Sequence, residues 1–408
     1  MVVVRSDGST VGCLPAFDLA QPWWMETGDL LAALRERFEL DAVVLRLVSA
    51  SRPRLEPGAD VTYAVEPLGP LPPQLPFDPC LDVQLGDDSE PLRMVWARPG
   101  GVAADIAWAD RELARLGRKR IGPAAQVRTW NLSLLMRLRT AQGVVWLKHV
   151  PAFMRHESAV IGLVREVGGA VPTVLAADPR SGLVLLDDVA GEDVYSPDER
   201  LAIRMVESLV AIQQRMTTNC AAIIAAGGPN WDSASLLREV TSLVARADVR
   251  TDLDSGELLA LDQLIKQLPS KLEALYACGL GDTLVHGDFH PGNHRFDGDK
   301  LVLLDWADSA VGHPLLDLMS FLERLAPEQV DIVQRAWIAA WSDAYPRANV
   351  LLAAELIRPI AALRLGVVYR GFLDAIEESE RVYHRMDVAT WLRRAVAESS
   401  RDSLGKQD

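Results

Sequence analysis

The chain has 408 residues, of which 49% are hydrophobic and 24% charged, and its formal net charge is -14. This composition is typical of a folded soluble protein and excludes a collagen-like, low-complexity or wholly disordered chain, because there is ample apolar surface to bury. The acidic balance disfavours nucleic acids and anionic membranes as general partners, since both would be repelled, and weakly favours a cationic small molecule. The length allows two or three domains.

The N-terminus and the cysteines both predict a cytoplasmic protein. Only Met1 to Val4 precede the first charged residue, Arg5, so there is no room for a signal-peptide core. No stretch is long and apolar enough to predict a transmembrane helix. The four cysteines contain no C-x-x-C pair, and we interpret them as reduced and buried; they are Cys13, Cys80, Cys220 and Cys278.

Residues 1–101 are predicted to form a small α/β domain of unknown role. Apolar runs predict strands over 42–48 and 61–65, and a further short strand over 93–97. Six prolines lie between Pro67 and Pro79, which predicts an extended connector. Within 1–101 the sequence shows no phosphate loop, metal cluster or nucleophile constellation.

The rest of the chain is predicted to be a strand-rich part over 102–190 followed by a helical part over 191–408. A helix is expected from Asp105 to Leu116, and strands between Gln126 and Val150 and over 183–186. Ser196 is predicted to cap the next helix, with Pro197 in its first position.

One segment brings polar side chains together at the end of a predicted hairpin. Asp297-Gly298-Asp299-Lys300 is a turn signal between two short extended runs. If Asp297 pairs with Lys300, Asn293 lies opposite Leu304 and therefore beside Asp305. An amide oxygen and a carboxylate are ligands that Mg²⁺ accepts when phosphates complete its shell. Asp288 lies in the loop just before, where a carboxylate can orient a hydroxyl and accept its proton.

The same segment resembles a known family. His286-Gly287-Asp288, with Asn293, Asp305 and the later Gly312 to Leu318, is similar to the aminoglycoside phosphotransferase and choline kinase group, which has the protein kinase-like fold. In that group the first Asp is the catalytic base, and the Asn and the second Asp hold Mg²⁺. The resemblance thus implies that Asp288 is catalytic and that Asn293 and Asp305 bind the metal. It assigns His286 and Asp317 structural support of the loop.

The resemblance also predicts a lysine that contacts the nucleotide phosphates and a glutamate that fixes it. Lys148 ends the apolar run Val144 to Leu147, and Glu157 begins a predicted helix. Taken alone, Lys148 is more typical of an edge residue whose charged end reaches solvent. Together with the downstream motif, we predict that Lys148 and Glu157 pair.

Four further residues are predicted to line the nucleotide site. The loop before Lys148 lacks the glycines of a kinase, and Asn131 and Ser133 there either donate hydrogen bonds to a phosphate or cap a turn. Asp187 and Val189 follow the strand over 183–186, in a segment that resembles the hinge between kinase lobes. Backbone groups there would contact the adenine, and the sequence does not distinguish ATP from GTP.

Two other clusters are assigned ordinary structural roles. Asp374, Glu377 and Glu378 could form an acidic wall for a cation, but we expect a solvated helix face with a Glu377–Arg381 pair. The adjacent Trp23 and Trp24 could stack on a ligand, but core or interface packing is expected.

The resemblance covers about residues 105–408 and implies an α+β, kinase-like fold of a small β-rich lobe and a larger helical lobe, with the additional N-terminal α/β domain. The expected activity is transfer of the γ-phosphoryl group of ATP, with Mg²⁺, to a hydroxyl of a small molecule, either an aminoglycoside-like or other amine-bearing compound. An amino-sugar or choline-type metabolite is an alternative acceptor. A catalytically degenerate, nucleotide-binding regulatory protein is the alternative of another class. The sequence does not predict the oligomeric state.

Overall fold

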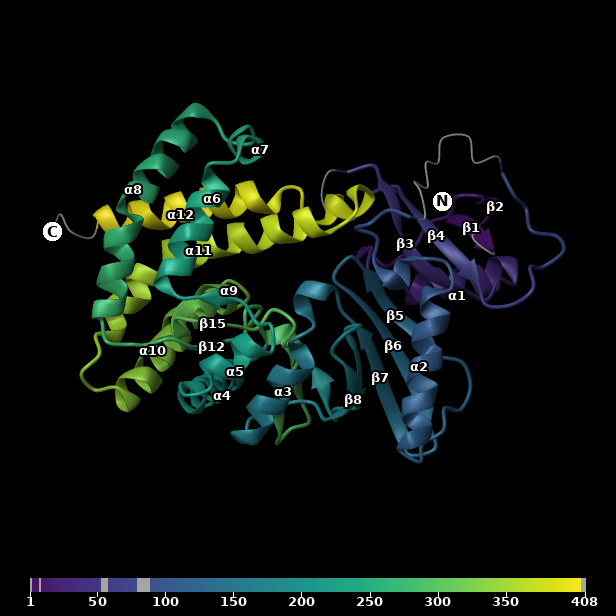
Figure 1. Cartoon of the computed structure of the whole chain (residues 1–408), viewed down its shortest axis with the longest axis horizontal. Coiled ribbons are helices and arrows are strands. Elements are labelled where there is room, and N and C mark those ends of the chain that lie inside the picture. Colours follow the sequence, from purple (N-terminus) through teal and green to yellow (C-terminus); the bar gives the residue numbers. More distant parts are fainter. Residues whose placement is uncertain (1, 7–8, 53–57, 79–88, 405–408) are drawn as a thin grey trace. The chain divides into compact units, whose positions relative to one another are not determined.

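The computed structural model describes residues 2–6, 9–52, 58–78 and 89–404. The chain divides into two compact units, and the polypeptide passes between them several times. The first unit consists of Met1–Ala152, Thr173–Asp188 and Gly371–Met386. The second consists of Phe153–Pro172, Val189–Arg370 and Asp387–Asp408. Figure 1 shows the strands of the first unit in purple and blue, and the long helices of the second in green and yellow.

The first unit begins with a four-stranded sheet in the order β2-β1-β4-β3, in which only β1 and β4 are parallel neighbours. Helix α1 (Gly28–Phe38) buries Leu30 and Leu34 in a core shared with Val44 and Val65. The strands are β1 (Val2–Ser6), β2 (Ser9–Leu14), β3 (Ala42–Ala50) and β4 (Val61–Pro67). The predicted strands over 42–48 and 61–65 are therefore confirmed.

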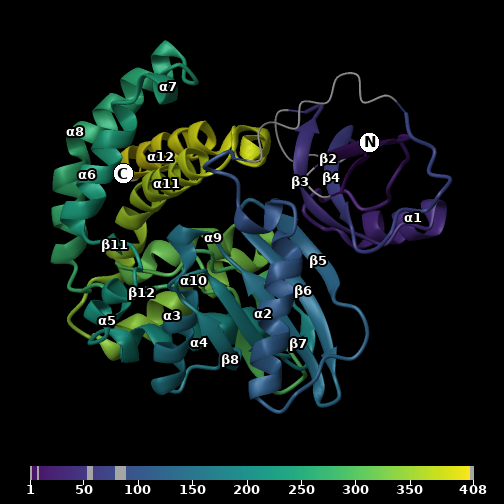
Figure 2. The same ribbon diagram turned by 45° about the vertical axis from the view of Figure 1, so that its right-hand side comes forward.

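A second, antiparallel sheet of the same unit has the order β5-β6-β7-β9-β8. Helix α2 (Gly101–Arg115) packs along it, as Figure 2 shows, through Val102, Ala109 and Leu113. The strands are β5 (Ala125–Trp130), β6 (Ser133–Thr140), β7 (Gly143–His149), β8 (Val174–Asp178) and β9 (Leu183–Asp187). Alternating apolar residues fix this arrangement, because every second side chain faces the helix.

Two predictions for the N-terminal part are wrong. Residues 95–97 form a 3₁₀ turn, η1 (Val95–Ala97), in place of a strand, because the backbone bonds locally: the Ala97 amide donates to the Met94 carbonyl at 3.1 Å and the Arg98 amide to the Val95 carbonyl at 3.3 Å. Cys13 is disulfide-bonded, whereas Cys220 and Cys278 are free thiols. Cys80 and Pro79, the end of the predicted proline-rich connector, lie outside the described residues.

The first unit also contains a segment from near the C-terminus, residues 371–386, which we name the strap. Its turn η5 (Glu378–Tyr383) buries Tyr383 in the core of the first sheet, 6.0 Å from Trp24 and 5.6 Å from Trp130 between ring centroids. Trp24 is thus a core residue, as predicted. Trp23 is 49% exposed, so the packing prediction is wrong for it.

The acidic residues of the strap differ from the predicted solvated face. Asp374 and Glu378 are exposed, as expected. Glu377 is buried, and its carboxylate accepts hydrogen bonds from Nε and Nη2 of Arg93 at 3.0 and 2.9 Å. The Nε of Arg46 lies 3.7 Å from the same carboxylate. A carboxylate can remain ionised in a buried position when cations pair with it. The sequence pattern around Glu377 does not reveal such a partner, because Arg93 is nearly 300 residues away.

The second unit is mostly helical, with short strands that hold its loops. Helix α4 begins after Asp198, whose carboxylate accepts from the Leu201 amide at 2.8 Å, so the predicted cap at Ser196 is wrong by two residues. The helices are α3 (Glu157–Glu166), α4 (Glu199–Met216), α5 (Cys220–Ala225), α6 (Ser233–Val244), α7 (Ala247–Arg250), α8 (Ser255–Ala277), α9 (Leu318–Leu322), α10 (Pro327–Ala344), α11 (Val350–Ala375) and α12 (Asp387–Leu404). The short strands are β10 (Glu192–Asp193), β11 (Asn230–Trp231), β12 (Thr283–Val285), β13 (His294–Phe296), β14 (Leu301–Leu303) and β15 (Ala310–Gly312), and short 3₁₀ turns are η2 (Ala152–Met154), η3 (Pro291–Asn293) and η4 (Pro314–Asp317).

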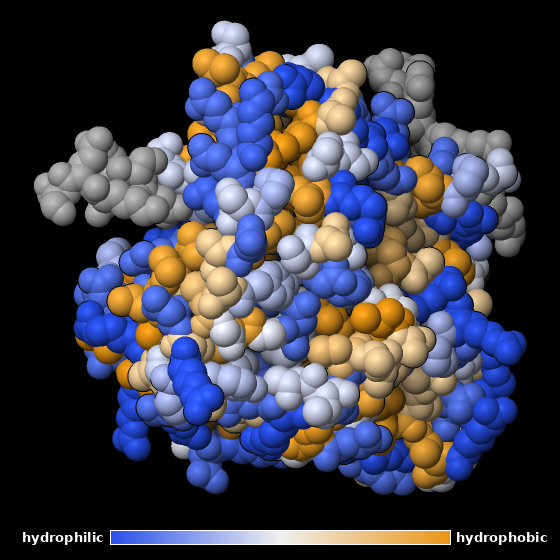
Figure 3. Space-filling view, turned by 60° about the vertical axis from the view of Figure 1, so that its left-hand side comes forward, coloured by the Kyte–Doolittle hydropathy of each residue, from blue (hydrophilic) through white to orange (hydrophobic). Residues whose placement is uncertain are grey.

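The surface mixes residue types. On the face in Figure 3, hydrophobic residues reach the surface in separate places among hydrophilic ones. Among the described residues, no helix has both the length and the apolar character needed to cross a membrane.

Candidate functional site

The predicted hairpin has the predicted register. Strands β13 and β14 pair antiparallel, with His294 opposite Leu303, and the Leu304 amide donates to the Asn293 carbonyl at 2.8 Å. Asp297 closes the turn, because its amide donates to the Lys300 carbonyl at 3.3 Å. The register therefore places Asn293 beside the start of the Asp305 segment.

The loop before this hairpin holds Asp288 against Asn293. Nδ2 of Asn293 donates to the Asp288 carbonyl at 2.9 Å and to its Oδ2 at 3.1 Å. The Asp288 side chain is 49% exposed, so its carboxylate is held on one side and open to solvent on the other.

Asp317 holds the backbone of this loop through hydrogen bonds. Its two carboxylate oxygens accept the backbone amides of His286 and Gly287, each at 2.8 Å. Burial raises the pKa of Asp317, and the two amide donors together with the charge of Arg364 oppose that shift. Two amide bonds to one buried carboxylate fix the backbone immediately before Asp288.

The His286 ring contacts the residues on either side of Asp305. The His286 ring donates from Nε2 to the Leu304 carbonyl at 2.9 Å and lies 4.7 Å from the fully buried Trp306 ring. Burial lowers the pKa of His286, which keeps the imidazole neutral. His286 therefore connects the loop to the end of the strand that precedes Asp305. The role of His286 and Asp317 in supporting a catalytic site stays a prediction.

Asp305 has a left-handed backbone, with φ of 57°. Such a conformation costs a non-glycine residue about 1 kcal/mol or more, and Asp and Asn tolerate it best. It turns the chain sharply after β14, and His156, at the start of α3, anchors the following segment through its ring contact with the Ser309 carbonyl at 2.8 Å. A strained residue in such a position is typical of functional sites.

His290 is a neighbour of Asp288 to which sequence analysis gave no role. Its Nε2 lies 3.4 Å from Oδ2 of Asp288, and its side chain is 22% exposed. The residue was visible in the motif from His286 to Asn293, but the spacing alone did not show that its ring turns back toward the carboxylate.

The predicted phosphate residues lie on two different units. Lys148, on β7, is buried in the first unit, and Glu157, at the start of α3, is buried in the second. The pairing of Lys148 with Glu157 stays a prediction.

The remaining predicted nucleotide residues have structural partners. The fully buried Asn131 donates to the Glu380 carbonyl at 3.3 Å and has His384 at 3.4 Å, so it holds the strap. Ser133 Oγ accepts from the Trp130 indole at 3.1 Å. Asp187 pairs with Arg118 at 2.9 Å in the first unit, and Val189 begins the second. Their contacts with a nucleotide stay predictions.

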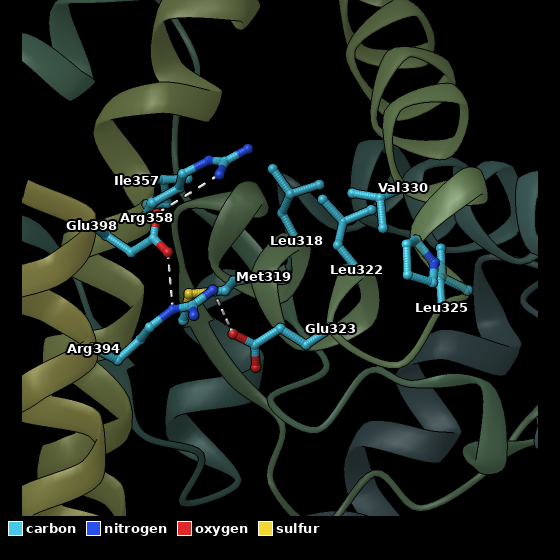
Figure 4. Close-up of a pocket in the computed structure, with 11 residues that line it drawn as sticks. Leu318, Met319, Leu322, Glu323, Leu325, Val330, Ile357, Arg358, Arg394 and Glu398 are labelled. Carbon is cyan, nitrogen blue, oxygen red and sulfur yellow. Dashed lines mark ion pairs between the residues drawn. The ribbon is translucent and has the colours of Figure 1, made fainter. Parts of the chain in front are cut away.

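A cavity of about 570 Å³ lies in the second unit, where side chains of α9, α10, α11 and α12 line it. Leu318 and Met319, which line it, directly follow Asp317, and Figure 4 shows apolar side chains of α9 and α10 on one side of it. On the other side, Glu398 pairs with Arg394 at 2.9 Å, and Arg394 also pairs with Glu323. The carboxylates of this cavity are thus matched by arginines.

A comparison with protein families decides the identity of the chain. The model of the phosphotransferase enzyme family matches residues 113–351, more than half of the sequence. The chain belongs to this family. The predicted kinship with aminoglycoside phosphotransferases and choline kinases is confirmed. A comparison with curated proteins finds no match.

Solved structures agree with this phosphotransferase fold. The GDP complex of aminoglycoside 2'-phosphotransferase-IIIa is 13% identical, with a TM-score of 0.52, and the match covers 73% of this chain and 99% of that one. A choline kinase from Streptococcus pneumoniae is 13% identical, with a TM-score of 0.51 and coverage of 72% and 99%. Macrolide 2'-phosphotransferase type I is 18% identical, with a TM-score of 0.50 and coverage of 71% and 97%. At such identities the likeness shows the fold, and the predicted α+β, kinase-like fold is confirmed.

Proposed function

We propose that this phosphotransferase moves the γ-phosphoryl group of ATP to a hydroxyl of a small, amine-bearing molecule in the cytoplasm. The observation that carries the proposal is the open carboxylate of Asp288, held by Asn293 on a loop that Asp317 fixes through two amides. Phosphoryl transfer needs a positioned hydroxyl and charge stabilisation more than covalent help from the protein, so a rigid, half-exposed carboxylate is suited to the task.

Asp288 would orient the acceptor hydroxyl and take its proton as the phosphoryl group transfers. Lys148 would hold the nucleotide phosphates, and Glu157 would fix the lysine. The oxygen donors of Asn293 and Asp305 fit Mg²⁺, which prefers a few protein oxygens together with phosphates. Bound Mg²⁺ would neutralise charge on the phosphates.

We propose as the acceptor site the cavity that Leu318 and Met319 line, which follow Asp317 in the chain; its volume of about 570 Å³ lies within the usual range for small-molecule sites. Leu318, Leu322 and Val330 provide apolar walls, while Glu323 and Glu398 provide carboxylates that arginines already balance. This lining favours an acceptor with an apolar body over a densely cationic one. An amino-sugar or a choline-type metabolite remains the alternative acceptor.

A Leu322→Trp variant tests this placement, because the indole would occupy part of the cavity. We expect the KM for the acceptor to rise about tenfold or more, as for other misfits in apolar pockets, while the KM for the nucleotide stays unchanged. Leu259→Trp, at a 63% exposed leucine of α8, is the matched control. A folded Leu322→Trp enzyme with an unaltered acceptor KM would place the acceptor elsewhere.

The function itself is tested by turnover of ATP and of GTP with a panel of hydroxylated amines that includes aminoglycosides, amino sugars and choline. GTP is included because one structural neighbour is a GDP complex. Acceptor-dependent nucleotide turnover would support the enzyme. Nucleotide binding without any acceptor-dependent turnover would favour the other class, a degenerate kinase-like regulator, against which the intact Asp288, Asn293 and Asp305 argue.

A further inference from the structure

The loop that carries Asp288 has no room for a cationic side chain of its own. Protein kinases have arginine between the histidine and the aspartate of this motif, whereas this chain has Gly287. Gly287 has φ of 91°, and a Cβ added there would lie 2.1 Å from the Asp308 carbonyl oxygen. Glycine is therefore required at this position, and any positive charge must come from another element.

Helix α11 supplies that charge through Arg364. Its Nη1 donates to the Gly287 carbonyl at 3.3 Å, and the whole side chain is 2% exposed. The guanidinium also lies over the Trp231 ring, 5.6 Å from the centroid. A buried arginine that ends on the carbonyl directly before Asp288 is placed to control where that residue points.

The charges around Arg364 are mostly negative. The carboxylates of Asp317, Asp308 and Asp288 all stabilise the charged guanidinium, in that order of strength, against the burial that lowers its pKa. Arginine remains protonated in such surroundings. Without this cation the buried carboxylate of Asp317 and the partly exposed carboxylates of Asp308 and Asp288 would repel one another more strongly.

The hydrogen bonding of Arg364 points to an electrostatic role. Within the described part of the chain its Nε is buried without a hydrogen-bond partner. The guanidinium therefore does not form the bidentate pair with a carboxylate that arginine often forms. Its position depends on the bond to Gly287 and on the surrounding charges. Because that single bond is to the backbone of the catalytic loop, a change in Arg364 acts first on the loop.

We propose that Arg364 is a positioning residue, which supplies from α11 the cation that the His286-Gly287-Asp288 loop lacks and holds Asp288 in line with the acceptor hydroxyl. This inference rests on the proposed function. Arg364 acts through Asp288, so its loss changes the chemical step and leaves nucleotide binding intact.

The test compares Arg364→Met, which keeps the length without the charge, with Arg364→Lys, which keeps the charge. For Arg364→Met we expect kcat to fall about 10- to 100-fold, the cost of a small misplacement of a catalytic group, with nucleotide affinity within about threefold of wild type. Arg364→Lys should recover part of the loss. Arg370→Met is the matched control, since Arg370 lies on the same helix and pairs with Asp248 at 3.0 Å; its kcat should be unchanged.

Hydrogen exchange of the loop gives a second measurement that needs no activity. Amides of the segment from Leu284 to His290 should exchange faster in Arg364→Met than in wild type or Arg370→Met. This separates the two proposals. If wild type phosphorylates none of the acceptors, the proposed function is wrong, and the exchange of the loop amides can still be compared between the variants. Unchanged exchange, or a wild-type kcat in a folded Arg364→Met enzyme, would overturn the role of Arg364. An equal fall of kcat in Arg370→Met would do so too, by showing a general effect of damage to α11.

Discussion

Asp288 is held by contacts from three separate parts of the chain. Asn293 binds its side chain, Asp317 binds the amides before it, and Arg364 binds the Gly287 carbonyl. Each contact fixes a different atom of the loop, so the carboxylate keeps its place without being buried. This combination of a rigid backbone and an open side chain is what a residue that orients a substrate hydroxyl requires.

Asp305→Asn tests the metal site without disturbing the backbone, because Asn tolerates the left-handed conformation as well as Asp does. If Asp305 holds Mg²⁺, the variant should need more Mg²⁺ for activity and should bind nucleotide more weakly, since the ion bridges the phosphates. A magnesium titration followed by nucleotide binding checks this. An unaltered titration would show that the ion is held elsewhere.

The sequence could predict the local part of this site and not the distant part. Asn293 and Asp305 are joined by one hairpin, so the turn at Asp297 was enough to place them side by side. Arg364 is 77 residues from Gly287, on a helix whose pattern does not show which polar residue turns inward. Only the packing of α11 against the loop reveals it.

The strap is an element whose charges are buried. Glu377 is paired with Arg93, but Glu380 lies beside Glu377 in a fully buried position. Burial, and then the neighbouring charge of Glu377, raise the pKa of Glu380 to about 8, while Arg46 opposes them. Glu380 is therefore protonated in the folded chain at neutral pH.

This shift predicts a pH dependence of stability. Glu380 keeps its proton in the folded chain up to about pH 8, whereas the unfolded chain releases it near the usual value of 4.5. Stability from this group is therefore complete below about pH 4.5 and is lost as the pH rises toward 8. Glu380→Gln, which stays neutral, should show a flatter fall of Tm over this interval than wild type. Parallel curves for the two proteins would mean that Glu380 is ionised when folded.

Elements whose position depends on the periodicity of apolar residues were predicted correctly. Predictions that depend on which polar side chains are buried were wrong. The strands that contain Val44 and Val65 follow from their apolar runs. Glu377 was misjudged because a buried ion pair and a solvated helix face have the same local sequence pattern. Trp23 and Trp24 are adjacent, and only the position of Tyr383 determines which of the two is buried.

At the scale of the whole molecule, the first sheet and the strap both lie outside the residues that the family model matches. The family match covers residues 113–351, which leaves out both the strands β1 to β4 and the strap. These two parts of the chain pack together, through Tyr383 and through Arg46 and Arg93 with Glu377. The domain boundaries after residues 101 and 190 stay a prediction.

Removal of residues 1–100 should therefore destabilise the protein. The truncation deletes Arg46, Arg93 and Trp24 together, which leaves Glu377 and Tyr383 without their main partners. We expect a lower Tm and poor solubility relative to the full chain, because an apolar patch and unpaired carboxylates become exposed. A truncated chain that melts at the same temperature and binds nucleotide equally well would show that residues 1–100 form an independent module.

The central claim is that Asp288 delivers an acceptor hydroxyl to the γ-phosphate. The most direct test is to measure phosphorylated acceptor by mass spectrometry for wild type and Asp288→Asn, with nucleotide affinity measured on the same samples. General bases typically contribute about 10²- to 10⁴-fold. We predict that Asp288→Asn loses product formation by such a factor while its Mg-nucleotide affinity stays within a few-fold of wild type. A variant that keeps more than about a tenth of wild-type product formation would contradict the account.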